Sequence, residues 1–340
     1  MKKKFQNSMV KHHPVLVTGG AGYIGSHTVR ELVNKGYGVV VLDNLSKGHK
    51  AAVTNAKLVV GDISDRELLR SIFRAHDIKA VIHFAASSMV GESMEKPMDY
   101  YRNNVLGGIS LLDAMIEAGV PHLIFSSTAA VYGELETALI PEEYIAVPKN
   151  PYGATKLALE GAIRWYGEAY GLNYTILRYF NAAGADPAGD IGEDHAPETH
   201  LIPLVLRAAM GLQKPLMVFG VDYPTPDGSC IRDYVHVSDL AAAHVLALDA
   251  LAAGSPANIY NLGNGNGYSV KDVLGVAKIV TGRPVPVEYT APRPGDPAVL
   301  VASSEKAKRE LGWRPRFTDL ATIMETAWRW HNSHPEGFGC

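Results

Sequence analysis

The stretch Val15-Leu-Val-Thr-Gly-Gly-Ala-Gly-Tyr-Ile-Gly25 decides the fold of this chain. Its first residues form a short β-branched apolar run, which is typical of a buried strand. Gly19, Gly22 and Gly25 follow, and a helical pattern continues over residues 24–35. Glycine permits a tight turn and lets the backbone approach a pyrophosphate, which then lies over the helix N-terminus. A strand, this turn and a helix in that order predict a dinucleotide site.

The alternation of strand and helix continues to about residue 180. The expected strands are 15–19, 38–43, 57–61, 79–85, 121–127 and 173–180, and the expected helices are 24–35, 65–75, 99–118 and 151–170. Nearly continuous apolar strands that alternate with helices predict an α/β fold, a Rossmann-like doubly wound parallel sheet with helices on both faces. Such sheets bind ligands at the carboxyl ends of their strands.

The sequence also predicts how the chain is divided. We expect residues 1–13 to be a flexible tail and residues 14–182 to be the dinucleotide-binding domain. A helix over 238–253 and a strand over 257–262 would let residues 230–262 rejoin that domain. The remaining segments, 183–229 and 263–340, are expected to form a smaller α/β lobe. Its expected features are loops at 181–200 and 222–229, a strand at 216–219 and a final helix at 319–332.

Composition excludes several classes of protein. The 340 residues are 47% hydrophobic, which suits a large core, and the net charge of -3 argues against nucleic acid as the main partner. No apolar run approaches the roughly 20 residues that a membrane-spanning helix needs, and the N-terminus lacks the apolar stretch of a secretory signal. With only Cys230 and Cys340, the sequence shows no disulfide framework, and we predict no metal site. We expect a soluble cytoplasmic protein.

A second motif, Tyr152-Gly-Ala-Thr-Lys156, indicates the chemistry. Residues four apart lie on one face of a helix, so the phenol of Tyr152 and the ammonium of Lys156 should be neighbours. A positive charge stabilises a phenolate, so we expect Lys156 to lower the pKa of Tyr152 and make it a usable base. The strand that ends at Thr128 adds a hydroxyl at the carboxyl edge of the sheet. Together they predict proton and hydride transfer at a carbinol carbon.

Asp43 indicates which dinucleotide binds. It ends the second strand, 18 residues after Gly25, where a carboxylate bonds the adenosine ribose diol and repels a 2′-phosphate. NAD is therefore favoured over NADP, with the alternative that Asp43 only forms a turn. Asp62, after the third strand, is either a contact to the adenine or the N-cap of the helix that follows.

These residues belong to a wider resemblance that covers residues 14 to about 335. The chain resembles the extended short-chain dehydrogenase/reductase family, and within it the 4-epimerases of UDP-hexoses. The stretches that carry the resemblance are Thr18-Gly-Gly-Ala-Gly-Tyr-Ile-Gly-Ser-His27, Val81-Ile-His-Phe-Ala-Ala86, Val90-Gly-Glu-Ser93, Phe125-Ser-Ser-Thr-Ala-Ala-Val-Tyr-Gly133, Leu177-Arg-Tyr-Phe-Asn181, Asp222-Tyr-Pro-Thr-Pro-Asp-Gly228, Arg232-Asp-Tyr-Val-His236 and Tyr260-Asn-Leu-Gly263.

The resemblance implies a role for each matching residue. Tyr152 would take the proton of the sugar 4-hydroxyl, Lys156 would bind the nicotinamide ribose, and Thr128 would bond the same hydroxyl. The implied contacts to NAD are Gly19, Gly22, Tyr23, Ile24, Gly25, Asp43, Asn44, Asp62, Ile63, Phe84, Ala85, Ala86, Asn103, Tyr152, Lys156 and Phe180. The implied contacts to the UDP-sugar, besides Thr128 and Tyr152, are Asn181, His200, Arg232, Arg293, Asp296 and Leu300.

The resemblance further implies the reaction. C4 of the bound hexose would give a hydride to NAD, the 4-ketose would turn over, and the hydride would return to its other face, so UDP-galactose and UDP-glucose would interconvert. The smaller lobe would hold the UDP-sugar, and NAD would stay bound through turnover. Relatives suggest a homodimer built on helices 99–118 and 151–170.

Several alternatives compete with this interpretation. Sugar 4,6-dehydratases place an Asp-Glu pair after the active-site threonine, but this chain has Ala129 and Ala130, which cannot act as acid and base. A non-catalytic dinucleotide sensor, a dehydrogenase that releases NADH and an epimerase of UDP-glucuronate remain conceivable.

Two positions bear on the range of substrates. Leu300 should wall the sugar pocket where relatives carry either tyrosine or a smaller residue, so UDP-GlcNAc and UDP-GalNAc, or a UDP-pentose, are alternative substrates. His200 lies near a position at which relatives contact the uridine phosphate, or else it caps the helix that follows.

Overall fold

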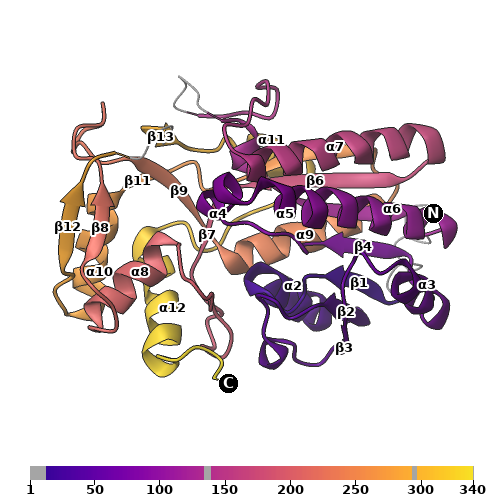
Figure 1. Cartoon of the computed structure of the whole chain (residues 1–340), viewed down its shortest axis with the longest axis horizontal. Helices are drawn as coiled ribbons and strands as arrows, with labels where there is room; N and C mark the ends of the chain where they lie inside the picture. The colour runs from indigo at the N-terminus through magenta and orange to yellow at the C-terminus, as the bar shows by residue number, and fades with distance from the viewer. Residues whose placement is uncertain (1–12, 134–138, 293–296, 340) are drawn as a thin grey trace.

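Seven parallel strands form the large sheet of this computed structural model, which describes residues 13–133, 139–292 and 297–339 (Figure 1). The strand order is β10-β6-β5-β4-β1-β2-β3. The strands are β1 Val15–Thr18, β2 Val39–Asp43, β3 Lys57–Val60, β4 Ala80–His83, β5 His122–Thr128, β6 Asn173–Tyr179 and β10 Asn258–Leu262. The order reverses direction between β1 and β4, which opens a crevice at the carboxyl ends of these two strands. The predicted doubly wound parallel sheet is confirmed.

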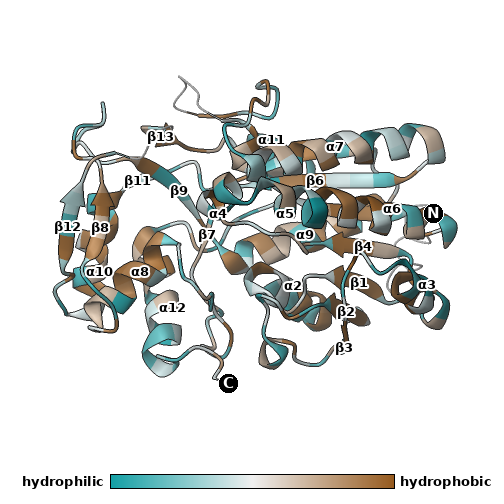
Figure 2. Ribbon diagram, in the orientation of Figure 1, coloured by the Kyte–Doolittle hydropathy of each residue, from teal (hydrophilic) through white to brown (hydrophobic). Residues whose placement is uncertain are grey.

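Helices cover both faces of this sheet. One face packs against α2 (Tyr23–Asn34) and α9 (Val237–Ala252), and the other packs against α3 (Arg66–Ala75), α6 (Gly107–Glu117) and α7 (Pro151–Tyr170). Successive side chains of a strand point to opposite faces, so Val15 and Val17 join the first core and Leu16 joins the second. Figure 2 shows the strands and the inner sides of these helices as mostly hydrophobic. Burial on two sides explains why the strands are apolar throughout.

A smaller group of elements lies at one end of the large sheet, at the left of Figure 1. Strands β8 (Leu216–Phe219) and β12 (Val287–Thr290) form a parallel pair, beside helices α8 (Leu201–Ala209), α10 (Val270–Thr281) and α12 (Leu320–Ser333). These elements share their own hydrophobic core. A four-stranded sheet connects them to the large sheet and consists of β7 (Asn181–Ala183), β9 (Ile231–His236), β11 (Gly267–Ser269) and β13 (Val299–Leu300).

Most of the predicted elements are present within one or two residues of their expected ends. Strand β10 pairs with β6 in the large sheet, as expected for a segment that rejoins it. Residues 181–200, expected to be a loop throughout, begin with strand β7, because Asn181–Ala183 pairs with β9. The short helices α4 (Val90–Glu95) and α11 (Glu305–Glu310) and the single 3₁₀ turns at Lys50–Ala52 and Ala129–Val131 complete the described elements.

The helix expected over 99–118 is interrupted. It consists of α5 (Pro97–Tyr100), a π-helical turn over Tyr101–Leu106 and then α6. Such turns carry an extra residue and re-aim the side chains on them, and they are frequent at functional sites. Here Asn104 bonds the backbone of Ser87 and the hydroxyl of Thr155, which ties this turn to α7.

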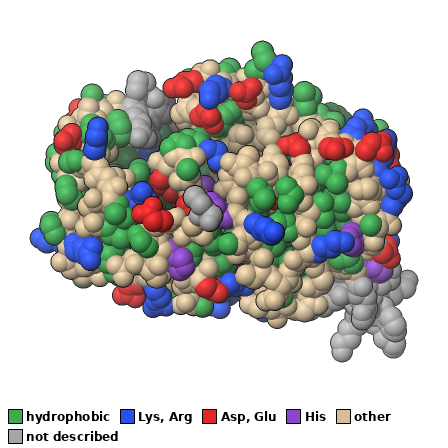
Figure 3. Space-filling model, turned by 60° about the horizontal axis from the view of Figure 1, so that its bottom comes forward, with side chains coloured by type: hydrophobic (Ala, Val, Ile, Leu, Met, Phe, Trp, Pro, Cys, Tyr) green, Lys and Arg blue, Asp and Glu red, His purple; other side chains and the backbone are tan. Residues whose placement is uncertain are grey.

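Two general features of the described residues concern the surface. None of their helices combines the length and the apolar character needed to cross a membrane. On the face drawn in Figure 3, the described Lys and Arg side chains are interspersed with Asp and Glu rather than gathered in one patch, as is typical of a solvated surface. Residues 1–12 of the expected tail, together with Arg293, Asp296 and Cys340, lie outside the described residues.

The turn between β1 and α2 requires glycine for two different reasons. Gly19 has a φ of +73°, and a Cβ there would lie 2.5 Å from the backbone nitrogen of Ala85. A Cβ on Gly25 would lie 2.1 Å from the carbonyl oxygen of Gly19, so helix α2 can begin this close to β1 only with glycine at that position. The turn therefore depends on close backbone packing as well as on backbone conformation.

Exchange of Gly25 for alanine tests this packing. Gly25→Ala should lower the thermal unfolding temperature, because an added methyl group in a closed site costs about 1–3 kcal/mol. Gly275→Ala is the matched control: this glycine is also helical, it is exposed, and no atom lies within 4 Å of its Cβ position. Alanine there should stabilise α10 by up to about 1 kcal/mol. Similar unfolding temperatures for the two variants would contradict the account of the turn.

Candidate active site

One cavity of about 600 Å³ lies at the carboxyl ends of the strands, between the large sheet and the smaller group of elements. Every predicted site residue that the structure describes lines it. On the cofactor side these are Gly19, Gly22, Tyr23, Ile24, Gly25, Asp43, Asn44, Asp62, Ile63, Phe84, Ala85, Ala86, Asn103 and Phe180. Thr128, Tyr152 and Lys156 lie in the same cavity, as do Asn181, His200, Arg232 and Leu300.

Asp43 fixes the backbone at the cofactor end of the cavity. Its Oδ2 accepts a hydrogen bond from the backbone nitrogen of Ala21 in the glycine turn, at 2.9 Å. Its Oδ1 accepts from the backbone nitrogen of Leu45, also at 2.9 Å, which supports the positive φ of Leu45. The carboxylate thus forms a turn and also faces the cavity, so the two interpretations of this residue from sequence are compatible.

Asp62 lies beside Asn44 and does not cap helix α3. The cap is Asp65, whose side chain accepts from the backbone nitrogen of Leu68 at 3.0 Å, so the N-cap alternative for Asp62 is wrong. The amide of Asn44 donates to Asp62 Oδ2 at 2.8 Å. Burial alone would raise the pKa of Asp62, but hydrogen bonds from Ser64 and Asn44 outweigh it and lower the pKa. A carboxylate held ionised here can accept a bond from an amino or hydroxyl group.

The start of α7 places Tyr152 against the end of β5. Asn150 caps the helix by accepting a hydrogen bond from the backbone nitrogen of Gly153 at 2.8 Å, and Pro151 occupies the first helical position. A Cβ on Gly153 would lie 2.4 Å from the carbonyl oxygen of Ala130, so α7 touches the chain just beyond Thr128. The phenol and the Thr128 hydroxyl are hydrogen-bonded as a result.

The electrostatics of this pair differ from the expectation. Burial raises the pKa of Tyr152 above its ordinary value, and the bond with Thr128 lowers it. The effect predicted for Lys156 belongs to Thr128 in this structure, because Lys156 Nζ donates to the carbonyl oxygen of Ser126 at 2.8 Å. Burial lowers the pKa of Lys156 to about 7, and Glu160 opposes that shift.

A buried ion pair supports α7 behind these residues. Arg178 Nε and Nη2 donate to the two carboxylate oxygens of Glu160, at 2.9 and 2.6 Å. Ser127 Oγ donates to Glu160 at 2.6 Å, and Arg178 Nη1 donates to the hydroxyl of Tyr132 at 3.0 Å. Bidentate geometry of this kind fixes direction as well as distance, so α7, β5 and β6 keep one relative position. Lys156 lies one helical turn before Glu160.

The other side of the cavity comes from the short strands that follow residue 180. Asn181 Nδ2 donates to the carbonyl oxygen of Asp233 at 3.0 Å, and Arg232 Nη1 donates to that of Ile231 at 2.8 Å. Leu300 on β13 is paired with Arg232 on β9. His200 is the N-cap residue of α8, but its side chain makes no capping hydrogen bond. Its Nδ1 lies 2.5 Å from Glu193 Oε1 instead, so the capping alternative is wrong.

The structure adds residues that the motifs did not indicate. Tyr179 lines the cavity at the end of β6, and strand β8 supplies a mostly apolar wall; the β8 residues are Leu216, Met217, Val218 and Phe219. The apolar pattern of 216–219 predicted a strand, but its place beside the cavity depends on how the smaller group of elements packs. Segment 87–90 also lines the cavity, next to the quoted stretch Val90-Gly-Glu-Ser93.

Comparisons with known proteins agree with this geometry. Residues 15–263 match the model of the NAD dependent epimerase/dehydratase family. A UDP-glucose 4-epimerase of Halalkalibacterium halodurans is 56% identical over 324 residues, which cover 95% of this chain and 97% of that protein. A solved structure of a UDP-glucose 4-epimerase superposes with a TM-score of 0.94 at 55% identity, covering 96% of this chain and 100% of that one.

A further solved structure was determined with a ligand. It is a UDP-glucose 4-epimerase from Brucella ovis in complex with NAD, with a TM-score of 0.91 and 50% identity over 93% of this chain and 97% of that one. The family model covers well over half of the chain, and these relatives cover nearly all of it. The chain belongs to the NAD dependent epimerase/dehydratase family.

Proposed function

We propose that this protein interconverts UDP-galactose and UDP-glucose by inverting C4 of the hexose, with NAD as a bound cofactor. One observation carries the proposal: Thr128, Tyr152 and Lys156 meet at the carboxyl edge of the sheet, inside the same cavity as the glycine turn and Asp43. This arrangement sets a proton acceptor beside the place where a dinucleotide fits. The near-complete matches to UDP-glucose 4-epimerases support the same assignment.

The residues present fit NAD. The glycine turn leaves no room for a side chain at Gly19 or Gly25, so its backbone can approach a pyrophosphate over the N-terminus of α2. The carboxylate of Asp43 suits a ribose diol and disfavours a 2′-phosphate. Lys156 lies on the face of α7 that carries Tyr152, where it would bond the nicotinamide ribose. NAD supplies a reversible hydride acceptor at its nicotinamide ring.

Within this cavity, Tyr152 would take the proton of the sugar 4-hydroxyl while C4 is oxidised to a ketone. Thr128 would hold the same hydroxyl in line, and its bond to the phenol stabilises the charged form of the base. Reduction of the ketone on its opposite face, with the proton returned by Tyr152, completes the inversion. The positions of Thr128 and Tyr152 are fixed by β5 and α7, so the sugar must move rather than the protein.

The two residues after Thr128 restrict what can happen to the ketone. Elimination of water needs an acid and a base next to the sugar, and Ala129 and Ala130 supply methyl groups only. Both alanines line the cavity. This argues for return of the hydride to C4 over onward dehydration, and hence for an isomerase over a dehydratase.

The division of labour along the chain follows from the same proposal. Residues 14–182 and 230–262 would hold NAD, while 183–229 and 263–340 would hold the UDP-sugar. Asn181 and Arg232 would bind the UDP moiety together with Arg293 and Asp296, which lie outside the described residues. Guanidinium groups bond a diphosphate bidentately, so UDP would be anchored while the uncharged hexose turns over.

The quaternary structure we propose is a homodimer, in a protein of galactose metabolism. The two helical segments at 97–117 and 151–170 expose several large hydrophobic side chains, which a second copy of these segments would cover. They are Met98, Tyr101, Leu106, Trp165 and Tyr170, each between 46% and 62% exposed apart from Trp165 at 69%.

Removal of the phenolic hydroxyl tests the role of Tyr152. Tyr152→Phe should lower the turnover of UDP-galactose by about 10²–10⁴-fold, the usual contribution of a general base, while bound NAD is retained. Tyr170→Phe is the control, because this tyrosine lies on the same helix outside the cavity and is 62% exposed. Full activity of Tyr152→Phe would refute its role as the base. Accumulation of free NADH by the unaltered protein would indicate a dehydrogenase instead.

The size of residue 300 should set the range of sugars. Leu300 lines the cavity and is smaller than tyrosine, so we expect the protein to interconvert UDP-GlcNAc and UDP-GalNAc as well. Leu300→Tyr should lower the rate with these N-acetylated substrates by about 10-fold or more and change the rate with UDP-galactose much less. Rates can be compared by chromatography of the products. An equal loss with both kinds of sugar would show that Leu300 does not select the substrate.

A further inference from the structure

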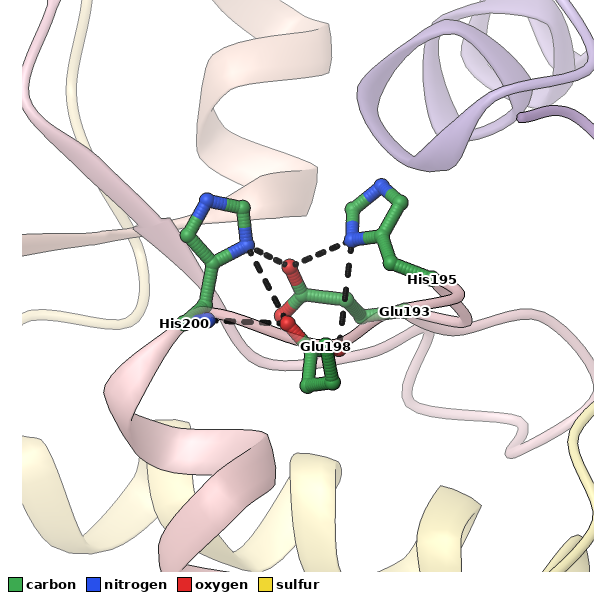
Figure 4. A group of neighbouring side chains, drawn as sticks. All are labelled: Glu193, His195, Glu198 and His200. Carbon is green, nitrogen blue, oxygen red and sulfur yellow. Dashed lines mark hydrogen bonds and ion pairs between the residues drawn. The ribbon is translucent and has the colours of Figure 1, made fainter. Parts of the chain in front are cut away.

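Four side chains of the segment between β7 and α8 meet at one point beside the cavity. They are Glu193, His195, Glu198 and His200, and Figure 4 shows the carboxylate of Glu193 between the two imidazole rings. One potential ligand atom from each residue lies within 4.8 Å of all the others. No step of the proposed reaction needs this group of four, which we term the His–Glu cluster.

The distances within the His–Glu cluster are close to those of a metal coordination shell. His200 Nδ1 lies 2.5 Å and His195 Nδ1 lies 3.3 Å from Glu193 Oε1. Both imidazole nitrogens also approach Glu198, at 3.7 Å from Oε1 for His200 and 3.9 Å from Oε2 for His195. Four ligands placed tetrahedrally about 2 Å from a zinc ion lie about 3.3 Å from one another. Small rotations of the side chains would therefore complete such a shell.

The surrounding structure already holds these side chains in place. The backbone carbonyl of Glu193 accepts a hydrogen bond from Trp330 Nε1 at 3.1 Å, and the Glu193 side chain is only 3% exposed. Glu198 Oε1 accepts hydrogen bonds from the backbone nitrogens of Thr199 and His200, at 2.7 and 2.8 Å. The ring of His195 packs edge-on against Tyr23. Little conformational entropy is left to lose when a ligand binds, which favours binding.

A small separate cavity adjoins the same residues. It holds about 10 Å³ of water-sized space and is lined by Glu193, His195 and Glu198, with Arg207 and His331 on its other side. A volume of this order accommodates a single water molecule or a single ion. Room for a ligand therefore exists next to the carboxylates without any movement of the backbone.

We propose that Glu193, His195, Glu198 and His200 form a binding site for one divalent transition-metal ion of the Zn²⁺ type. Two carboxylates balance the charge of a dication, and two neutral imidazoles add ligands without adding charge. Imidazole nitrogen suits Zn²⁺, Co²⁺ and Ni²⁺, whereas Mg²⁺ and Ca²⁺ prefer shells made of oxygen alone. The sequence alone predicted no metal site because the four residues were recognisable only when the loop had been folded.

The ion would have a structural role at this position. Segment 193–200 is bonded to the cofactor side of the molecule, since Lys47 Nζ donates to the carbonyl oxygen of Ala196 at 2.8 Å and His49 Nε2 lies 3.1 Å from that of Asp194. The same segment leads directly into α8, and His195 and His200 line the main cavity. A metal ion would cross-link this segment and fix the wall that the cofactor side and α8 share.

Co²⁺ titration of the full-length protein tests the proposal. After treatment with a chelator and removal of the chelator, the protein should bind one Co²⁺ per chain and develop the visible d–d absorption of a tetrahedral site. Zn²⁺ should displace Co²⁺ and remove the absorption, and an excess of Mg²⁺ should not. Binding to the folded state alone should also raise the thermal unfolding temperature by a few degrees.

Two variants and a matched control locate the site. His195→Ala and Glu198→Gln should each weaken Co²⁺ binding by at least about 10-fold. His49→Ala, which removes a histidine that contacts the same segment from outside the His–Glu cluster, should bind Co²⁺ like the unaltered protein. The proposal is overturned if the unaltered protein binds neither Co²⁺ nor Zn²⁺, or if the variants bind as tightly as the control. The readout is metal binding, so it does not depend on the epimerase activity.

Discussion

The close approach of α7 to the end of β5 is the constraint on which the site depends. Gly153 touches the carbonyl of Ala130, Asn150 caps the helix at that point, and Lys156 bonds the carbonyl of Ser126 on β5. These three contacts lie within two turns of one helix, and they leave Tyr152 facing Thr128. The buried pair of Glu160 and Arg178 fixes the next turn of α7 to β6. A base and its partner hydroxyl are thereby held on rigid elements, which keeps the reacting geometry precise.

The cavity joins two parts of the molecule with different tasks. The glycine turn and Asp43 are built on the first two strands, where backbone packing leaves no freedom, whereas the wall opposite comes from short strands and from helix α8. Segment 193–200 connects the two, through Lys47 and His49 on one side and Trp330 on the other. An epimerase of the proposed kind needs a fixed cofactor and a mobile sugar, and this arrangement is rigid where the dinucleotide fits and less regular where the hexose would turn.

The sequence predicted the parts of the fold that are governed by local pattern. Strands buried on both faces and amphipathic helices such as 151–170 carry strong periodic signals, and their bounds agree closely with the structure. The π-helical turn at Tyr101–Leu106 and the three-residue strand β7 were missed because tertiary contacts, not local preference, create them. The cofactor residues follow one continuous motif and were predicted together. The apolar wall of β8, the direction of the Lys156 ammonium and the His–Glu cluster required the packed structure.

The central claim is that C4 of the sugar loses and regains the same hydrogen inside one cavity. UDP-galactose that carries deuterium at C4 measures this directly when it is converted without added cofactor and the product is analysed by mass spectrometry and NMR. Retention of the deuterium at C4 of UDP-glucose is the predicted result, because the hydride acceptor and Tyr152 face the substrate in a single site. Loss of the deuterium to solvent, or its appearance in free NADH, would contradict the account.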